Sequence, residues 1–258
     1  MTLHERHVRG LPLPKLGKNA PRLDPRTFKL AKYLKPPLPL PPSEVSWITK
    51  VPQPMPMYLN DALGNCVIAA EAHMINQWTR YAAREVFPTD ADVLTVYERV
   101  AGYVPGDPST DNGTDPLSAL QDWRKNGLAG RKIIAYMSVD KSNLTEIFQA
   151  IMLFGSLFTG IQLPISAQGQ NAWTVPSGGA FGDGSPGSWG GHMVPIFAGS
   201  PKTFTCETWG QSLKMSRNFF WNYVDETWVV LSQDWLDTTG NAPSGFNMAQ
   251  LRADIAAL

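Results

Sequence analysis

Apolar positions follow helical spacing over much of the stretch between residues 66 and 154. The longest such helix is predicted from Cys66 to about residue 85, because large and small apolar side chains recur every three or four residues, at Val67, Ala70, Met74, Trp78 and Tyr81. Further helices are predicted over about 90–100, from Pro116 to the Asn-Gly pair at 126–127, and from a cap at Asn143 to Phe154. Each is expected to bury one face.

Strand patterns dominate the later part of the chain. Short β-rich runs predict strands over 133–137, 157–163, 192–197, 203–209, 215–221 and 227–232, and a short amphipathic helix over 246–258. Helices followed by a mainly antiparallel sheet indicate an α+β fold with two lobes.

The first 56 residues differ in composition, since they contain 12 of the 22 prolines. The run over 36–42 predicts extended polyproline, because proline fixes φ and lacks an N–H. We therefore divide the chain into a Pro-rich extended N-terminal arm, 1–56, and one domain, 57–258. The arm is a docking strap, a propeptide-like cover of a cleft or a simple tether. A strap, docked on the body or on a partner, fits best because Leu38, Leu40 and Trp47 provide apolar side chains.

The charges balance, with 22 Lys plus Arg against 22 Asp plus Glu, so we expect no nucleic-acid or membrane partner. Two cysteines in 258 residues do not make a disulfide scaffold. The start has no signal-peptide core, and no apolar run is long enough to span a bilayer. These features predict a cytoplasmic protein, with later export or incorporation into a virion left open.

Candidate chemistry begins at Cys66, where a loop with Gly64 leads into the first turn of the long helix. Backbone N–H groups at a helix start stabilise a thiolate, the nucleophilic form of cysteine. His192 opens an apolar strand behind Gly190 and Gly191, and is a candidate base. The alternatives are an inert buried thiol and a strand-edge histidine.

The other thiol and imidazole groups are assigned structural roles. His73 lies two helical turns beyond Cys66, too far to act as its base, and Cys206 is expected to face the core as a free thiol. Cysteines and histidines match no metal-ligand spacing, so neither a metal nor another cofactor is expected. The glycine-rich loop 177–191 is either a surface loop or a flap over the substrate.

Four motifs in the same order resemble those of papain-like cysteine peptidases, across roughly residues 57–235. They are Gly64-Asn65-Cys66, Asp111-Asn112-Gly113 before a helix, Gly190-Gly191-His192, and Glu207-Thr208-Trp209-Gly210 in the place of an Asn-Ser-Trp-Gly run. The interval from Cys66 to His192 is slightly shorter than the roughly 130–150 residues typical of that family.

The resemblance implies a two-lobed fold, with a helical lobe and an antiparallel sheet or barrel lobe. It implies that Cys66 is the nucleophile, that His192 is its base, and that Glu207 orients the imidazole under the cover of Trp209. The oxyanion donors would be the Cys66 N–H and the Asn60 side chain. Substrate would lie along Asn112, Gly113, Gly190, Gly191 and Trp209.

The sequence departs from the family pattern at several of these positions. Asn60 stands where the family has glutamine, Glu207 where it has asparagine, and Val67 where a tryptophan usually follows the nucleophile. The family's paired structural cysteines are absent. These departures bear on rate and substrate more than on fold.

The implied activity is hydrolysis of an amide, most directly a peptide bond in a peptide or protein substrate, through an acyl-thioester. Two alternatives stay open. The same residues could act on peptidoglycan amides or transfer an acyl group. The chain could instead be a catalytically weak or inactive binding or assembly module, such as a virion or effector component.

Overall fold

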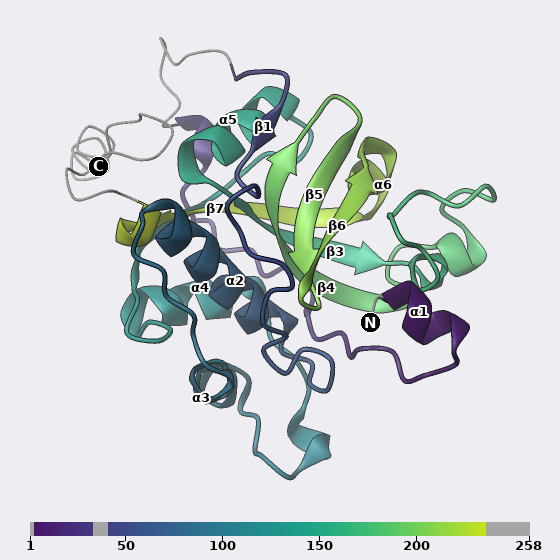
Figure 1. Cartoon of the computed structure of the whole chain (residues 1–258), viewed down its shortest axis with the longest axis horizontal. Coiled ribbons are helices and arrows are strands. Elements are labelled where there is room, and N and C mark those ends of the chain that lie inside the picture. The colour runs from purple at the N-terminus through teal and green to yellow at the C-terminus, as the bar shows by residue number, and fades with distance from the viewer. Residues whose placement is uncertain (1–2, 33–40, 236–258) are drawn as a thin grey trace.

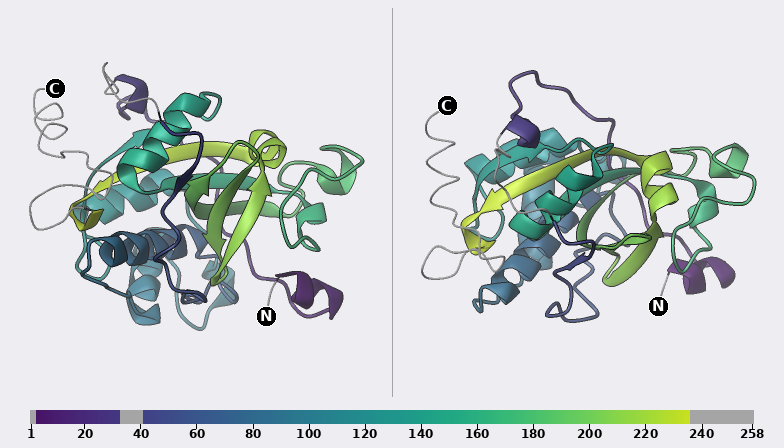
Figure 2. Two further views of the ribbon diagram at one scale, coloured as in Figure 1. Left: turned by 45° about the horizontal axis from the view of Figure 1, so that its top comes forward. Right: turned by 90° about the horizontal axis from the view of Figure 1, so that it is seen from above.

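The computed structural model describes residues 3–32 and 41–235 and has an α+β architecture (Figure 1). Three helices, α2 (Cys66–Tyr81), α3 (Asp90–Ala101) and α4 (Pro116–Lys125), form one side of the molecule. An antiparallel sheet forms the other, with α5 (Leu144–Phe154) and α6 (Arg217–Tyr223) packed against it. The two further views show the same division into a helical and a sheet lobe (Figure 2).

The described residues form a seven-stranded antiparallel sheet in the order β2-β7-β3-β4-β5-β6, with β1 paired to β4. Its strands are β1 (Val45–Ser46), β2 (Ile133–Ser138), β3 (Leu157–Leu163), β4 (Gly190–Gly199), β5 (Thr203–Thr208), β6 (Gln211–Ser216) and β7 (Val224–Ser232). Strand β4 is the longest and pairs with three others, so it connects the halves of the sheet.

Helix α2 is buried along its length, and the prediction of a single buried stripe was too narrow. Every residue from Cys66 to Thr79 is buried, because the helix lies between the other helices and strand β4. Its polar side chains have internal partners. Gln77 donates to the Gly155 carbonyl at 2.7 Å, and Trp78 donates to the Phe154 carbonyl while stacking on Trp123.

The predicted helix boundaries are close to those observed. Asn143 caps α5 by accepting from the Glu146 N–H, and Gly155 ends that helix in the left-handed region. One predicted strand, over 215–221, is wrong. The strand β6 ends at Ser216, whose hydroxyl accepts from the Phe219 N–H and starts helix α6. A short apolar run does not distinguish a strand from a helix, and the local cap decides here.

The N-terminal residues run against the body rather than away from it. After the short helix α1 (Leu3–Val8) the chain passes between the helical lobe and the sheet. Further along, β1 pairs with β4, and Trp47 donates its indole N–H to the Ile151 carbonyl. Most of the predicted polyproline run and the predicted helix over 246–258 lie outside the described residues. Within the described residues, every helix is too short or too polar to cross a bilayer.

Candidate active site

Cys66 occupies the first position of α2, at the junction of the two lobes. The loop before it is held by side chains, because Asn65 donates to the Tyr58 carbonyl at 2.7 Å. The Cys66 sulfur is buried and is reached by backbone N–H groups of Gly17 and Met193, with that of Val67 from its own helix. The thiol of α2 therefore contacts strand β4 at Met193, the residue that follows His192, and among the described residues the His192 Nδ1 makes no hydrogen bond to it.

His192 is fully buried on β4, and its ring is fixed by two neighbours. Its Nε2 lies 2.7 Å from the hydroxyl of Thr208, the last residue of β5. The indole of Trp209 stacks on the imidazole, with 4.5 Å between the centroids and 16° between the planes. Trp209 reaches this position with a φ of 48°, in the left-handed region that is costly for a large side chain. Trp209 thus stacks on the imidazole, but it covers a hydrogen bond to Thr208 and not the predicted one to Glu207.

The orienting contact is not made by Glu207, and this part of the sequence prediction needs correction. Glu207 accepts from Gln53 at 2.9 Å and from the Ser212 hydroxyl at 3.1 Å. Successive strand residues point to opposite faces, and the pleat of β5 turns Thr208 toward His192 and Glu207 away from it. Thr208 stands directly before Trp209 in the motif, so the alternation along the strand was the available signal.

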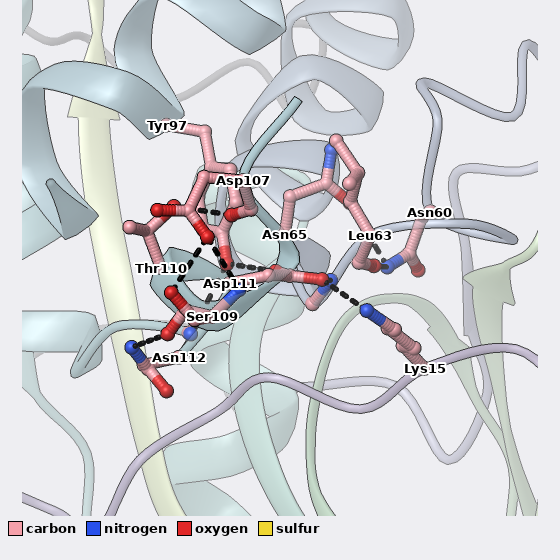
Figure 3. Close-up of polar contacts among 12 residues, drawn as sticks. Lys15, Asn60, Leu63, Asn65, Tyr97, Asp107, Ser109, Thr110, Asp111 and Asn112 are labelled. Carbon is pink, nitrogen blue, oxygen red and sulfur yellow. Dashed lines mark hydrogen bonds and ion pairs between the residues drawn. The ribbon is translucent and has the colours of Figure 1, made fainter. Parts of the chain in front are cut away.

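Asn60 is buried close to the nucleophile loop, but its amide is engaged inside that loop. Its Nδ2 donates to the Asn65 side chain at 3.1 Å and to the Leu63 carbonyl at 3.3 Å. Both hydrogens of the amide are therefore used, and none is directed at a substrate oxygen (Figure 3).

Residues of the arm lie across the thiol and form one isolated parallel bridge, between Lys18 and Thr114. Thr114 donates its N–H to the Gly17 carbonyl at 2.9 Å and accepts from the Asn19 N–H at 3.0 Å. On the other side, the Lys18 N–H donates to the Gly191 carbonyl at 3.0 Å. The arm's backbone thus joins the α4 side of the site to β4 and covers Cys66.

Glycines make this close approach possible. A Cβ added at Gly113 would lie 2.0 Å from the Gly17 carbonyl oxygen, and one at Gly191 would lie 2.1 Å from the Lys18 carbonyl oxygen. On the arm, a Cβ at Gly17 would lie 1.7 Å from the Gly64 oxygen. At Gly17, Gly113 and Gly191 there is therefore no space for a side chain.

The residues predicted to line a substrate therefore separate into two groups. Gly113, Gly190 and Gly191 face the arm. Asn112 does not, because its side chain is exposed and donates to the Ser109 carbonyl (Figure 3). The paired backbone hydrogen bonds are made by Thr114 instead, which follows Gly113 and which sequence reasoning missed.

Asp111 connects the arm, the nucleophile loop and the helical lobe (Figure 3). Its carboxylate accepts from Lys15 at 2.7 Å, from the Gly64 N–H at 3.0 Å and from the Tyr97 hydroxyl at 2.5 Å. The hydrogen bonds of Lys15, Tyr97 and Gly64 together hold the pKa of Asp111 below its usual value despite burial. The carboxylate is therefore ionised and fixes the edge of the site.

Exclusion of water keeps the thiol and the imidazole neutral. Burial raises the pKa of Cys66, although the N–H groups around its sulfur and the charge of Lys18 act in the opposite direction. Burial lowers the pKa of His192 to about 3. Its Nδ1 is buried without a hydrogen-bond partner among the described residues. Burial therefore disfavours a thiolate–imidazolium ion pair in the covered site.

The remaining candidates have structural positions. His73 Nε2 donates to the Pro56 carbonyl at 2.9 Å, and burial lowers its pKa to about 4. Cys206 is a buried free thiol, as is Cys66. Trp189, at the end of the loop 177–191, packs on Trp209 with 5.7 Å between ring centroids. Over the described ranges, no cluster of three or more His, Cys, Asp or Glu side chains could hold a metal ion.

The architecture is similar to that of solved cysteine proteases. Xylellain from Xylella fastidiosa aligns with a TM-score of 0.66 at 15% identity, over 85% of this chain and 96% of its own. A cysteine protease from Carica candamarcensis gives 0.53 at 13% identity, over 74% and 99%. Procathepsin L 3 from the larval midgut of Tenebrio molitor gives 0.57 at 11% identity, over 90% and 79%.

The chain therefore has the papain-like fold, and the sequence prediction of that fold is confirmed. No family model and no curated protein matches the sequence itself.

Displacing the arm should expose the thiol. In Gly17→Ala the added methyl would collide with the Gly64 carbonyl, so the arm cannot seat and water reaches Cys66. We expect iodoacetamide to modify Cys66 at least about tenfold faster than in the unaltered chain near neutral pH, measured by mass spectrometry. Gly178→Ala is the matched control, since its added Cβ has no atom within 4 Å. Cys206 should stay slow throughout. Equal rates at Cys66 in all three proteins would contradict the covering role.

Glu207 should make stability depend on pH. Burial raises its pKa from 4.5 to about 7, so the folded state favours the protonated carboxyl. Its contribution to the free energy of unfolding is complete below about pH 4.5 and is lost as the pH rises through 7. Glu207→Gln needs no proton, so it should match the unaltered chain at pH 5 and exceed its stability at pH 8, by up to roughly 3 kcal/mol. Urea unfolding at both pH values measures this, and identical pH dependence of the two proteins would refute it.

Proposed function

We propose that this chain is a thiol hydrolase that cleaves peptide bonds, with Cys66 as the nucleophile and His192 as its base. The observation that carries the proposal is the strand of backbone bound across the Cys66 sulfur, between Gly191 and Thr114. A groove that binds an extended peptide at a thiol on a helix start has the shape required for peptide hydrolysis.

The chemistry follows from the orientation of the imidazole. With Nε2–H donating to Thr208, the Nδ1 lone pair is available to take the Cys66 proton. The thiolate attacks the substrate carbonyl carbon, and His192 returns the proton to the leaving amine. Water then hydrolyses the acyl-thioester.

The oxyanion is met first by the Cys66 N–H, because N–H groups at a helix start lack partners within the helix. Asn60 supplies a second donor if its 3.3 Å hydrogen bond to the Leu63 carbonyl is exchanged for one to the oxyanion. The exchange is necessary because both hydrogens of the Asn60 amide are already donated within the loop.

The arm holds the enzyme latent and is not itself a substrate in this position. Gly17 presents its N–H to the Cys66 sulfur, and an N–H offers no electrophilic carbon. Its carbonyl is turned to the Thr114 N–H on the opposite wall. Covering of the cleft was one of the roles considered for the arm. The similarity to a procathepsin, a precursor by its name, supports this proposal.

A binding or assembly module without turnover is the second candidate. It is favoured by the neutral, buried imidazole, whose Nδ1 has no hydrogen-bond partner among the described residues. The next measurement separates the two candidates.

Gly17→Ala should convert the full-length chain into an active peptidase. We expect hydrolysis of a fluorogenic peptide library to rise at least about tenfold over the unaltered chain, because the groove is free for substrate. The added change Cys66→Ala should remove the activity, and Gly178→Ala should leave the basal rate unchanged. No hydrolysis by Gly17→Ala, with its Cys66 shown to be accessible to alkylation, favours the binding module.

Thr208 should act as the positioning residue for His192. In the Gly17→Ala background, Thr208→Val should lower kcat by at least about tenfold with little change in KM, because the imidazole loses its orienting hydrogen bond. Thr208→Ser keeps a hydroxyl and should recover most of kcat. If Glu207→Gln lowers kcat instead while Thr208→Val does not, the orienting role belongs to Glu207.

A further inference from the structure

The arm places a charged side chain in a closed pocket beside the thiol. The side chain of Lys18 is fully buried, and its Nζ lies 2.8 Å from Asp225 Oδ2 and 2.9 Å from Glu226 Oε1. Lys18 directly follows Gly17, whose N–H reaches the Cys66 sulfur. The residue that fills the pocket is therefore next in sequence to the residue that contacts the Cys66 sulfur.

Two neighbouring strand residues serve the same ammonium because the strand is irregular there. Asp225 and Glu226 follow each other near the start of β7, and their side chains would normally point to opposite faces. The register between β3 and β7 shifts at this place, where Gly160 pairs with Glu226 but Ile161 pairs with Val224. Such a bulge redirects a side chain, so both carboxylates reach one site.

The body of the protein holds both carboxylates without help from the arm. Gln162 donates to Asp225 at 2.6 Å, and the Trp228 indole N–H donates to Glu226 at 2.8 Å. Within the described residues, Lys18 makes the ion pairs of both acids. When the arm leaves, the pocket keeps its shape and carries two acidic groups without a cation.

A glycine in the wall gives room for a long side chain. A Cβ added at Gly160 would lie 2.1 Å from Lys18 Cε, closer than any side-chain contact allows. Gly160 has no positive φ, so the backbone does not require glycine at this position. An added Cβ would also lie 2.7 Å from Asp225 Oδ1 and 2.8 Å from Glu226 Cγ, so glycine leaves room both for the inserted chain and for the two acids that receive it.

We infer that this pocket selects a lysine or arginine side chain in the substrate, at the residue whose N–H pairs with the Gly191 carbonyl and whose two neighbours pair with Thr114, as Lys18 and its neighbours do in the arm. The inference rests on the proposed peptidase function and adds its specificity. A cation replaces the ion pairs that Lys18 makes, whereas an apolar side chain would leave both carboxylates without a cation. Lys18 thus occupies the position that the preferred substrate residue would take.

Binding without turnover tests the pocket separately from catalysis. Full-length Gly17→Ala with Cys66→Ala is titrated with labelled peptides that differ at one residue, lysine, arginine, norleucine or alanine, and fluorescence anisotropy is recorded. We expect lysine and arginine peptides to bind at least about tenfold more tightly than the norleucine peptide. Adding Asp225→Asn and Glu226→Gln should reduce this preference to about twofold or less. Glu44→Gln, an exposed carboxylate, is the control and should leave the preference unchanged.

A second variant keeps the test valid if the double acid change fails to fold. Gly160→Ala should weaken binding of the lysine peptide by at least about tenfold and spare the alanine peptide, because the added methyl fills the path of a long side chain.

The active Gly17→Ala chain is then assayed for hydrolysis of the same peptides. Preferential binding of basic peptides without hydrolysis keeps the pocket inference and rejects the peptidase. Hydrolysis with equal kcat/KM for lysine and norleucine keeps the peptidase and rejects the pocket. Absence of binding by every peptide also rejects the pocket.

Discussion

The packing of helix α2 against strand β4 determines where the chemistry of this molecule lies. It brings the sulfur at the start of α2 to the Met193 N–H, next to His192. The helix is buried from Cys66 to Thr79 and is tied to its surroundings through Gln77 and Trp78, so its start cannot move without disturbing the core. Close-packed interiors resist such shifts. The thiol and the imidazole are therefore held by the fold, and only the electrostatic environment can change easily.

That environment is controlled by the arm. With Gly17 over the sulfur, water is excluded and burial dominates the pKa of both Cys66 and His192, in opposite directions. Both shifts favour the neutral forms. An active thiolate–imidazolium pair needs the reverse, and the N–H groups at the helix start can favour it only when the burial cost falls. Under the proposed function, the latent and active forms would differ in the solvation of the thiol and the imidazole and not in the packing that holds them.

Much of the fold could be predicted from the sequence. Periodicity located α2, and the motifs placed Cys66 at the start of that helix and His192 near the start of β4, behind Gly190 and Gly191. The predictions failed where a shift of one or two positions along the chain decides which residue contacts the site. Thr208 and Glu207 differ only in the face of β5 to which they point, and Thr114 lies two positions beyond Asn112 in a loop. Contacts distant in sequence, such as Lys18 with Asp225, leave no local pattern at all.

The ion pairs of Lys15 and Lys18 differ in how much they contribute to holding the arm over the site. The ion pair of Lys15 with Asp111 is half exposed on the lysine side and adds little, whereas Lys18 is fully buried between its two carboxylates. The arm is also part of the chain, and a short tether gives a local concentration in the millimolar range. A free peptide offering the same backbone hydrogen bonds and the same cation must compete with that concentration. In the proposed peptidase, selectivity and latency would depend on the same few interactions. A change that loosens Lys18 in its pocket would then also weaken substrate binding, whereas a change at Gly17 would displace the arm without altering the pocket.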